Sequence, residues 1–416
     1  MGHEQKITLR TLMKNKIFIT CLLIPYLEPR SIQELITYGN SSIWSVISNI
    51  FSLFKLMSLS VIILLIIITQ KGKFKISKIS ILIIAYEAWI ILVNYINGYE
   101  IFARIQWALL IIGLVLLTEL YLNMNLFSEF VRCLSFWLGI LIVANLVTMI
   151  LYPNGMYVDN NGWTENFLFS FKNMHIYMFL PYLAAKPLAD LLKEGKLSWS
   201  FYVMVGVIFV SAYIANSTTT LVAMIVLFIC ILFFRESKSR IVNPIFWFIG
   251  SVVLSIFIIV FNVQSYFATS LEALFQKPIG TFHNRTYIWD LALNYFAKNP
   301  IIGNGYLSFY ASFSKNLITQ MHNQYLDVLI IGGAFLGILF GIIIFSACKK
   351  ISKRHGLICS NLLSFSLICY FILFLTEAYR NNVLIFFVIV AAYHIDKVAP
   401  IVRREQQKKK RFRLKI

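Results

Sequence analysis

Charged residues, and acidic ones above all, are scarce in this sequence. Only 13% of the 416 residues are charged, and Asp and Glu together number 18. Apolar residues make up 59% of the chain and the mean hydropathy is +0.76, far above that of ordinary soluble domains. This composition excludes a soluble globular protein and indicates a polytopic membrane protein.

Several chemical motifs are also missing. The six cysteines include no Cys-x-x-Cys pair and all fall within or at the ends of apolar stretches, so neither a structural disulfide nor a zinc site is expected. The six histidines show no metal-ligand spacing, and the chain has neither Asp-x-Asp nor a Gly-x-x-x-x-Gly-Lys loop. We therefore expect no metal, no bound nucleotide and no other cofactor.

Long apolar runs recur along the chain, and most are long enough to cross a hydrocarbon core of about 30 Å. They predict an all-α fold, a single transmembrane domain over residues 1–416. About twelve spans are expected, at 17–36, 51–69, 79–97, 105–122, 134–152, 174–191, 199–216, 217–235, 244–262, 324–347, 357–376 and 381–396. Pro25 and Pro29 interrupt the first run, which lacks the cleavage site of a signal peptide. The alternation typical of an outer-membrane barrel is absent.

The basic residues predict the orientation. With twelve spans, both termini and every second loop lie on one side, and that side holds all but nine of the 37 Lys and Arg residues. The positive-inside rule places this side in the cytoplasm. The net charge of +19 is scattered over these loops, so we expect no nucleic-acid partner. Only the tail "RREQQKKKRFRLK" forms a basic patch, suited to anionic membrane lipids.

One loop is much longer than the others, residues 263–323, and the predicted topology puts it on the outer side. A connection of this length in a compact bundle is usually functional or disordered. Apolar and aromatic residues recur in it at helical spacing: Tyr287, Ile288, Leu291, Tyr295 and Phe296. We expect an amphipathic helix that ends at Pro300 and lies along the membrane face over a cavity. His322 stands at the end of this loop, facing outward.

The outer face of a membrane holds no ATP or nucleotide sugar, so a bond made there must draw on energy stored in a substrate such as a lipid-linked pyrophosphate. Fixed cations are then needed at headgroup level, and the planar fork of arginine binds phosphate bidentately. The outward candidates are Arg285, Arg380, Arg104 and Lys172, with Lys55 in the outer half of the second span. Charged groups at that depth are functional candidates by default.

The segment "NRTYIWDLALNYFAKNPIIGNGYLSFY…MHNQYLDVLIIGG" resembles the signature of the O-antigen ligase and Wzy-type polysaccharide polymerase family. The shared features are an Arg four residues before a Trp, a Pro-x-x-Gly-x-Gly turn, and a His-Asn pair that opens a span with glycines about eleven residues on. Here they are Arg285, Trp289, Pro300, Gly303, Gly305, His322, Asn323 and Gly333. Weaker similarities surround Asn173 and Ser217.

The sequence departs from the family pattern at two points. Many members have Ser-Arg-Thr where this chain has Ser217, Thr218 and Thr219, so one expected basic residue is missing, and Lys172 or Arg104 is the candidate replacement. The second glycine after the His-Asn pair is displaced to Gly337.

The resemblance implies a C-type glycosyltransferase fold and metal-independent transfer of glycan from an undecaprenyl pyrophosphate carrier, at the outer face of the bacterial cytoplasmic membrane. It favours a polymerase of repeat units for capsule, exopolysaccharide or O-antigen, with a flippase and a chain-length regulator as possible partners. His322 would accept or orient the proton of the acceptor hydroxyl, and Arg285 would stabilise the departing pyrophosphate. The expected substrate-binding residues are Arg380, Lys172, Arg104, Asn323, Trp289 and Asn284.

Other interpretations stay open. A ligase would move the finished chain onto a lipid or protein acceptor. A transporter of the same lipid would show inverted repeats and charges near mid-membrane, and the sequence shows neither. His322 is also compatible with an interfacial hydrogen-bonding role, Arg285 with a salt bridge to Asp290, and Glu377 with a local pair to Arg380.

Overall fold

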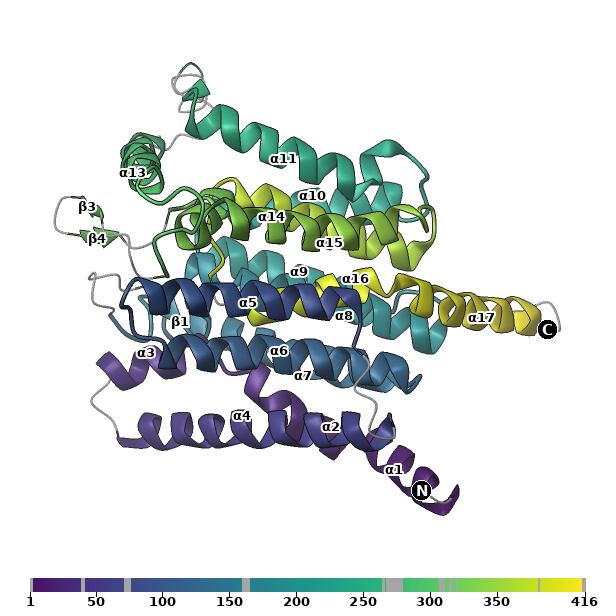
Figure 1. Cartoon of the computed structure of the whole chain (residues 1–416). Coiled ribbons are helices and arrows are strands. Elements are labelled where there is room, and N and C mark those ends of the chain that lie inside the picture. The colour runs from purple at the N-terminus through teal and green to yellow at the C-terminus, as the bar shows by residue number, and fades with distance from the viewer. Residues whose placement is uncertain are drawn as a thin grey trace.

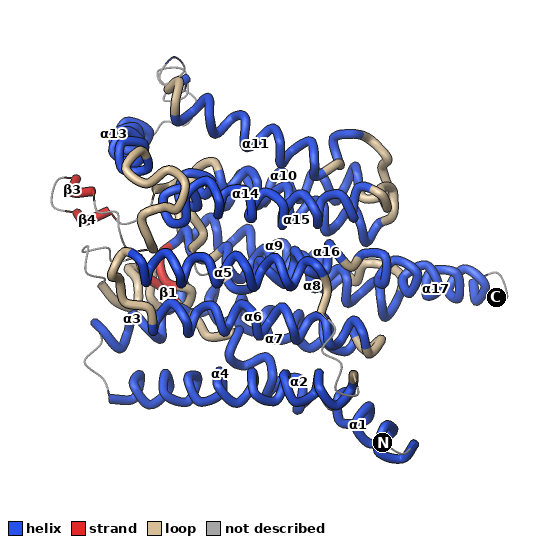
Figure 2. The backbone as a smooth tube through the Cα atoms, viewed as in Figure 1, coloured by secondary structure: helices blue, strands red, loops and turns tan. Residues whose placement is uncertain are grey.

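The protein is a bundle of helices that run roughly side by side between two ends (Figures 1 and 2). The computed structural model describes residues 3–38, 42–70, 76–158, 165–263, 266, 280–306, 311–313, 316–318, 321–380 and 382–413. The long helices are α4 (Ser42–Thr69), α5 (Lys78–Ile96), α6 (Phe102–Asn123), α7 (Phe127–Leu151), α8 (Ile176–Glu194), α14 (Gln324–Ser352) and α17 (Ile395–Arg413). The others are α1 (His3–Lys14), α2 (Lys16–Leu23), α3 (Arg30–Tyr38), α9 (Trp199–Ile214), α10 (Thr218–Phe234), α11 (Pro244–Ile259), α13 (Gly280–Phe296), α15 (Ile358–Phe374) and α16 (Val383–Tyr393).

Every predicted span coincides with helical structure, which confirms an all-α, polytopic membrane protein. Among the described residues, α4, α5, α6, α7 and α14 are long and apolar enough to cross a membrane, and α16 with α17 makes a sixth span if their 71° bend breaks one crossing. The apolar helices α9, α10, α11 and α15 have 16 or 17 residues. They extend about 24–26 Å, slightly less than a typical hydrocarbon core.

Two predicted spans are broken rather than continuous. The first ends as α2 at Leu23, passes through a 3-10 turn at Ile24–Tyr26 and restarts at Arg30 as α3, because Pro25 has no N–H to donate and disfavours a continued helix. The last ends as α16 at Tyr393 and bends into α17. The basic tail therefore continues as a helix to Arg413.

The centre of the bundle is formed by α15 and α16, which are apolar around their whole circumference and almost entirely buried. The loop that joins them, residues 375–382, lies at one end of the bundle. The chain termini lie at the opposite end, while α13 and the hairpin of β3 (Ala311–Phe313) and β4 (Asn316–Ile318) lie at the same end as that loop (Figure 1).

The long loop 263–323 contains the predicted amphipathic helix as α13. Small antiparallel hairpins were not predicted: β3–β4 in this loop, and β1 (Asn166–Phe167) with β2 (Ser170–Phe171) before the turn η2 (Lys172–Met174). These segments gather the residues between spans at the end of the bundle where His322 lies.

Candidate active site

A buried carboxylate, Glu377, connects the two residues proposed to carry the chemistry. Its side chain is 6% exposed in the loop between α15 and α16. Oε1 accepts hydrogen bonds from Arg285 Nη2 at 3.0 Å and Asn173 Nδ2 at 2.9 Å, and Oε2 lies 3.2 Å from His322 Nδ1. The structure thus brings His322 and Arg285 to one acidic group that the sequence interpretation had not placed with them.

The charge of Glu377 follows from this environment. Burial alone would raise the pKa of its carboxyl, but Arg285 and His322 outweigh burial and hold the pKa below its ordinary value of 4.5. The carboxylate is therefore ionised at neutral pH and accepts the proton of His322 Nδ1. When the imidazole carries its proton on Nδ1, the lone pair of Nε2 is available to accept a proton.

His322 occupies a strained backbone position. Its φ of +48° lies in the left-handed region, which non-glycine residues rarely adopt. The next residue, Asn323, caps the N-terminus of α14: its Oδ1 accepts from the N–H groups of the first turn. Its Nδ2 donates to Ser255 Oγ at 2.7 Å and Leu375 O at 3.2 Å. Asn323 is fully buried, so its observed role is to anchor His322, and a substrate contact stays a prediction.

The spacing of Arg285 and Trp289 has a structural reason. Trp289 is 1% exposed and its Nε1 donates to Met321 O at 2.9 Å, which fastens α13 to the residue before His322. Arg285 lies one turn earlier on the same face of α13 and reaches Glu377 rather than Asp290, so the salt bridge considered from the sequence is wrong. The side chain of Asn284 lies outside the described residues.

The glycine turn fits into a break in α14. Gly332 and Gly333 leave helical geometry there, so backbone carbonyls just before them lose their helical hydrogen bonds. The turn at residues 300–305 supplies new donors: Asn304 N donates to Ile330 O at 2.8 Å and Gly305 N donates to Ile331 O at 3.0 Å. Buried backbone groups at membrane depth need such partners. A Cβ at Gly333 would collide with the turn backbone, so this close approach requires glycine.

Arg380 and Arg104 lie in a buried ionic layer beside this turn. Arg380 Nε donates to both carboxylate oxygens of Asp327 at 2.8 Å, and Arg104 pairs with Glu87. Both guanidinium groups lie 5.2 Å from the ring centre of Tyr306, a cation–π distance. The interpretation of Glu377 with Arg380 as a local pair is therefore wrong, while substrate binding by the two arginines stays a prediction.

The segment around η2 reaches the same carboxylate from another side. Ser217 Oγ donates to Asn173 Oδ1 at 3.4 Å, and Asn173 in turn donates to Glu377. The position where the family pattern expects Ser-Arg-Thr is therefore connected to the site through Asn173. Lys172 is half-buried with its Nζ 5.4 Å from the ring centre of Phe171, and its role as a substrate-binding residue stays a prediction.

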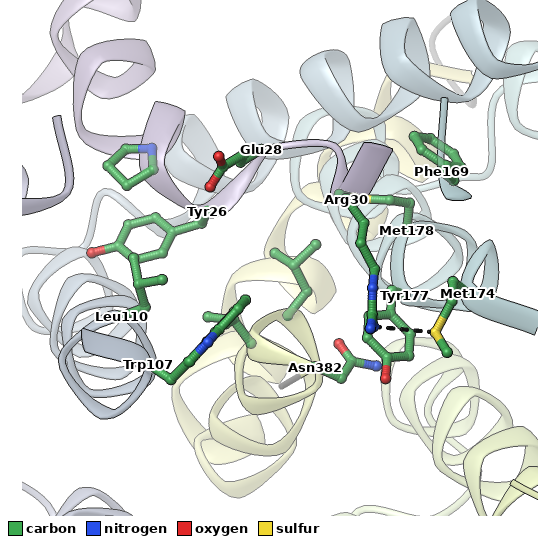
Figure 3. A pocket seen from close by; sticks show the side chains of 13 residues that line it. Tyr26, Glu28, Arg30, Trp107, Leu110, Phe169, Met174, Tyr177, Met178 and Asn382 are labelled. Atoms are coloured by element: carbon green, nitrogen blue, oxygen red, sulfur yellow. Dashed lines mark hydrogen bonds between the residues drawn. The ribbon is translucent and has the colours of Figure 1, made fainter. Parts of the chain in front are cut away.

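A cavity of about 250 Å³ begins next to this site. It is lined by Tyr26, Glu28, Arg30, Trp107, Tyr177 and Asn382 among others. Figure 3 shows Arg30 entering it beside Tyr177 and Met174, with Tyr26 and Trp107 on the opposite wall. Tyr177 joins the cavity to the site because its hydroxyl donates to Arg380 O at 2.7 Å.

Sequence reasoning missed Glu377, Asn173 and Arg30 as site residues. One signal was present for Glu377: a lone acid between two apolar spans is costly and needs partners. Arg30 is one of the nine basic residues outside the predicted cytoplasmic side, but nothing in its local sequence predicts that it lies against a cavity. Among the described residues, no group of three or more His, Cys, Asp or Glu could hold a metal ion.

The comparisons with known proteins support the resemblance found in the sequence. No curated protein and no solved structure matched the chain. Residues 203–341 match the model of a family described as O-antigen ligase. This segment runs from α9 to the middle of α14 and includes Arg285, Trp289, the glycine turn and His322. The chain is therefore a polytopic membrane protein in which residues 203–341 are similar to the family described as O-antigen ligase.

Proposed function

We propose that this protein is a polymerase of lipid-linked oligosaccharide repeat units, working at the outer face of the bacterial cytoplasmic membrane. It would transfer the growing chain from an undecaprenyl pyrophosphate carrier onto the next repeat unit, without a metal. The observation that carries the proposal is the contact of both His322 and Arg285 with Glu377, which places a histidine held by a carboxylate beside a cation suited to phosphate. The family match supports a glycan substrate.

The reaction is a displacement at the anomeric carbon of the growing chain. The acceptor hydroxyl oxygen forms the new glycosidic bond, its proton passes to Nε2 of His322, and the bond from the anomeric carbon to the pyrophosphate oxygen breaks. Glu377 holds the imidazole in the productive orientation and stabilises the imidazolium that forms. The imidazole side chain is 29% exposed, so a substrate hydroxyl has access to it.

Arg285 would receive the charge that develops on the leaving pyrophosphate. Within the described part of the chain its hydrogen bond uses Nη2 alone, which leaves Nε and Nη1 for phosphate oxygens. Glu377 neutralises this guanidinium while the site is empty, so phosphate binding competes with an existing partner. Arg30, 38% exposed at the cavity, is a further candidate for the basic residue that the Ser217 segment lacks.

The proposed topology has twelve crossings with both termini in the cytoplasm. Both termini lie at the end of the bundle opposite α13 (Figure 1), and this arrangement supports an even number of crossings. The site then faces outward, where a flippase would deliver the lipid-linked units and a chain-length regulator would act on the product.

A ligase is the second candidate, favoured by the description of the matching family as O-antigen ligase. The same site chemistry serves both reactions, and the acceptor distinguishes them. A polymerase extends one lipid-linked repeat unit into a ladder of products, whereas a ligase needs a different acceptor.

The test is incubation of the purified protein with one synthetic lipid-linked repeat unit, with products separated by gel. We expect a ladder from the wild type and at least a 10²-fold slower reaction from His322→Ala. Arg285→Lys keeps the charge but loses the bidentate fork, so it should also be slow. A wild type that makes no ladder but transfers glycan to a lipid or protein acceptor would replace the polymerase proposal with the ligase.

A further inference from the structure

A large groove lies at the end of the bundle opposite His322. It has a volume of about 1140 Å³ and runs between the α1–α2 junction, α7, α8 and α9. The start of α7 lies near the chain termini, because Tyr121 at the end of α6 donates to Met13 O and Asn123 accepts from Lys397. The groove therefore opens on the side that the charge distribution assigns to the cytoplasm.

Cations gather at one end of this groove. Five basic residues line it: Lys14, Lys16, Arg132, Lys186 and Lys193. Its acids are Glu129 and Asp190, and Asp190 is already held by Lys186 Nζ at 2.5 Å. Among the described residues, Lys14, Lys16 and Arg132 are exposed and belong to none of the ion pairs. The groove thus keeps an unneutralised positive end.

The other end of the groove is apolar. Along α7 the lining changes from Arg132 to Phe136, Ile140 and Val143, which are 61%, 41% and 42% exposed. Eleven residues of helix separate Arg132 from Val143, about 17 Å at 1.5 Å per residue. That length is close to half of a 30 Å hydrocarbon core, so the polar-to-apolar gradient matches the depth of one membrane leaflet.

We propose that this groove binds one anionic phospholipid of the cytoplasmic leaflet. The phosphate would contact Lys16 and Arg132, and an acyl chain would lie along Phe136 and Ile140. Lipid that merely surrounds a membrane protein needs no concave surface and no cluster of cations, whereas both are present here. Basic pockets between helices on the cytoplasmic side are a recognised way of binding anionic headgroups. This inference does not depend on the reaction proposed for His322.

The test is native mass spectrometry of the full-length protein in detergent, titrated with phosphatidylglycerol or with phosphatidylcholine of identical acyl chains. We expect tighter binding of phosphatidylglycerol with a stoichiometry of one. The variant Lys16→Gln/Arg132→Gln should weaken that binding roughly 30-fold, since each basic residue near the surface contributes about fivefold. The matched control Lys78→Gln/Arg240→Gln removes two exposed charges outside the groove and should change the affinity less than twofold.

Three outcomes would overturn the proposal. Equal affinity for the two lipids would show that the cations do not select a headgroup. Equal binding of glycerol 3-phosphate and phosphatidylglycerol would show a site for free phosphate instead of lipid. A dimer lost in Lys16→Gln/Arg132→Gln, with lipid binding unchanged, would show that a second copy of the chain occupies the groove. The variant Lys14→Gln/Lys193→Gln removes two other basic residues of the same groove and tests the proposal independently. Its thermal midpoint is measured to check that it folds.

Discussion

Replacing Glu377 with glutamine tests the arrangement of the site most directly, because it removes one charge and keeps the size. Glu377 Oε1 accepts from both Asn173 and Arg285, while Oε2 faces His322 Nδ1. Glutamine has one oxygen, which the two donors will retain. The NH₂ group of the glutamine then faces His322 Nδ1. Two N–H groups cannot form a hydrogen bond with each other, so Nδ1 cannot keep its proton there. His322 must move its proton to Nε2, the nitrogen that the reaction needs as a base.

The magnitude follows from the role of the base. General-base catalysis contributes roughly 10²–10⁴-fold, about 3–5.5 kcal/mol of transition-state stabilisation, and Glu377→Gln should lose most of it. Glu377→Gln should also lower the stability by roughly 1–3 kcal/mol, because Arg285 keeps a hydrogen bond but loses its charged acceptor while remaining largely buried. Glu377→Asp keeps the charge and the tautomer but withdraws the carboxylate by about one C–C bond of 1.5 Å, so its rate should be intermediate.

The assay is the initial rate of ladder formation from a synthetic lipid-linked repeat unit, with the thermal midpoint measured on the same preparations. Because His322 and Glu377 act as a unit, the double variant His322→Ala/Glu377→Gln should be little slower than His322→Ala alone. Glu377→Gln at the wild-type rate would refute the tautomer argument. Multiplicative losses in the double variant would show that the two residues act independently.

Other predictions test the charge, the glycine contact, the topology and the metal. The pKa of Glu377 in the folded protein lies below 4.5. The stability that its ionised carboxylate contributes is therefore complete above pH 4.5 and is lost as the pH falls through the pKa of the folded state. The thermal midpoint of the wild type should fall toward that of Glu377→Gln in acid. Gly333→Ala should lower the midpoint by the equivalent of 1 kcal/mol or more, since φ is +67° and the turn leaves no space; Gly341→Ala, with open space around it, is the control. A reporter fused after Lys298 should indicate the outer face and one after Lys238 the cytoplasm, and the reverse pattern would overturn the topology. Polymerisation should survive a strong chelator, and loss restored by a divalent ion would reveal a metal site.

The class of this protein and the positions of its helices could be predicted from the sequence because both depend on local composition. A run of apolar residues forms a helix in a membrane wherever it lies in the chain, since the backbone must satisfy its own hydrogen bonds. Local sequence also predicted α13, from the helical spacing of its apolar residues, and the interruption at Pro25, from the geometry of proline. The family signature placed Arg285 and His322 together as candidates, but only as a likeness.

The tertiary structure decided how the charges pair. Glu377 contacts residues 55, 92 and 204 positions away, and no local pattern encodes which helix ends meet at one side of a bundle. Local spacing indeed suggested Arg380 as its partner, whereas packing against α14 gives Arg380 to Asp327. Burial makes these pairings selective, because an ion left without a partner in the interior costs several kcal/mol. The sequence therefore determined which residues are chemically able to form the site, and the packing of the helix ends determined which of them do.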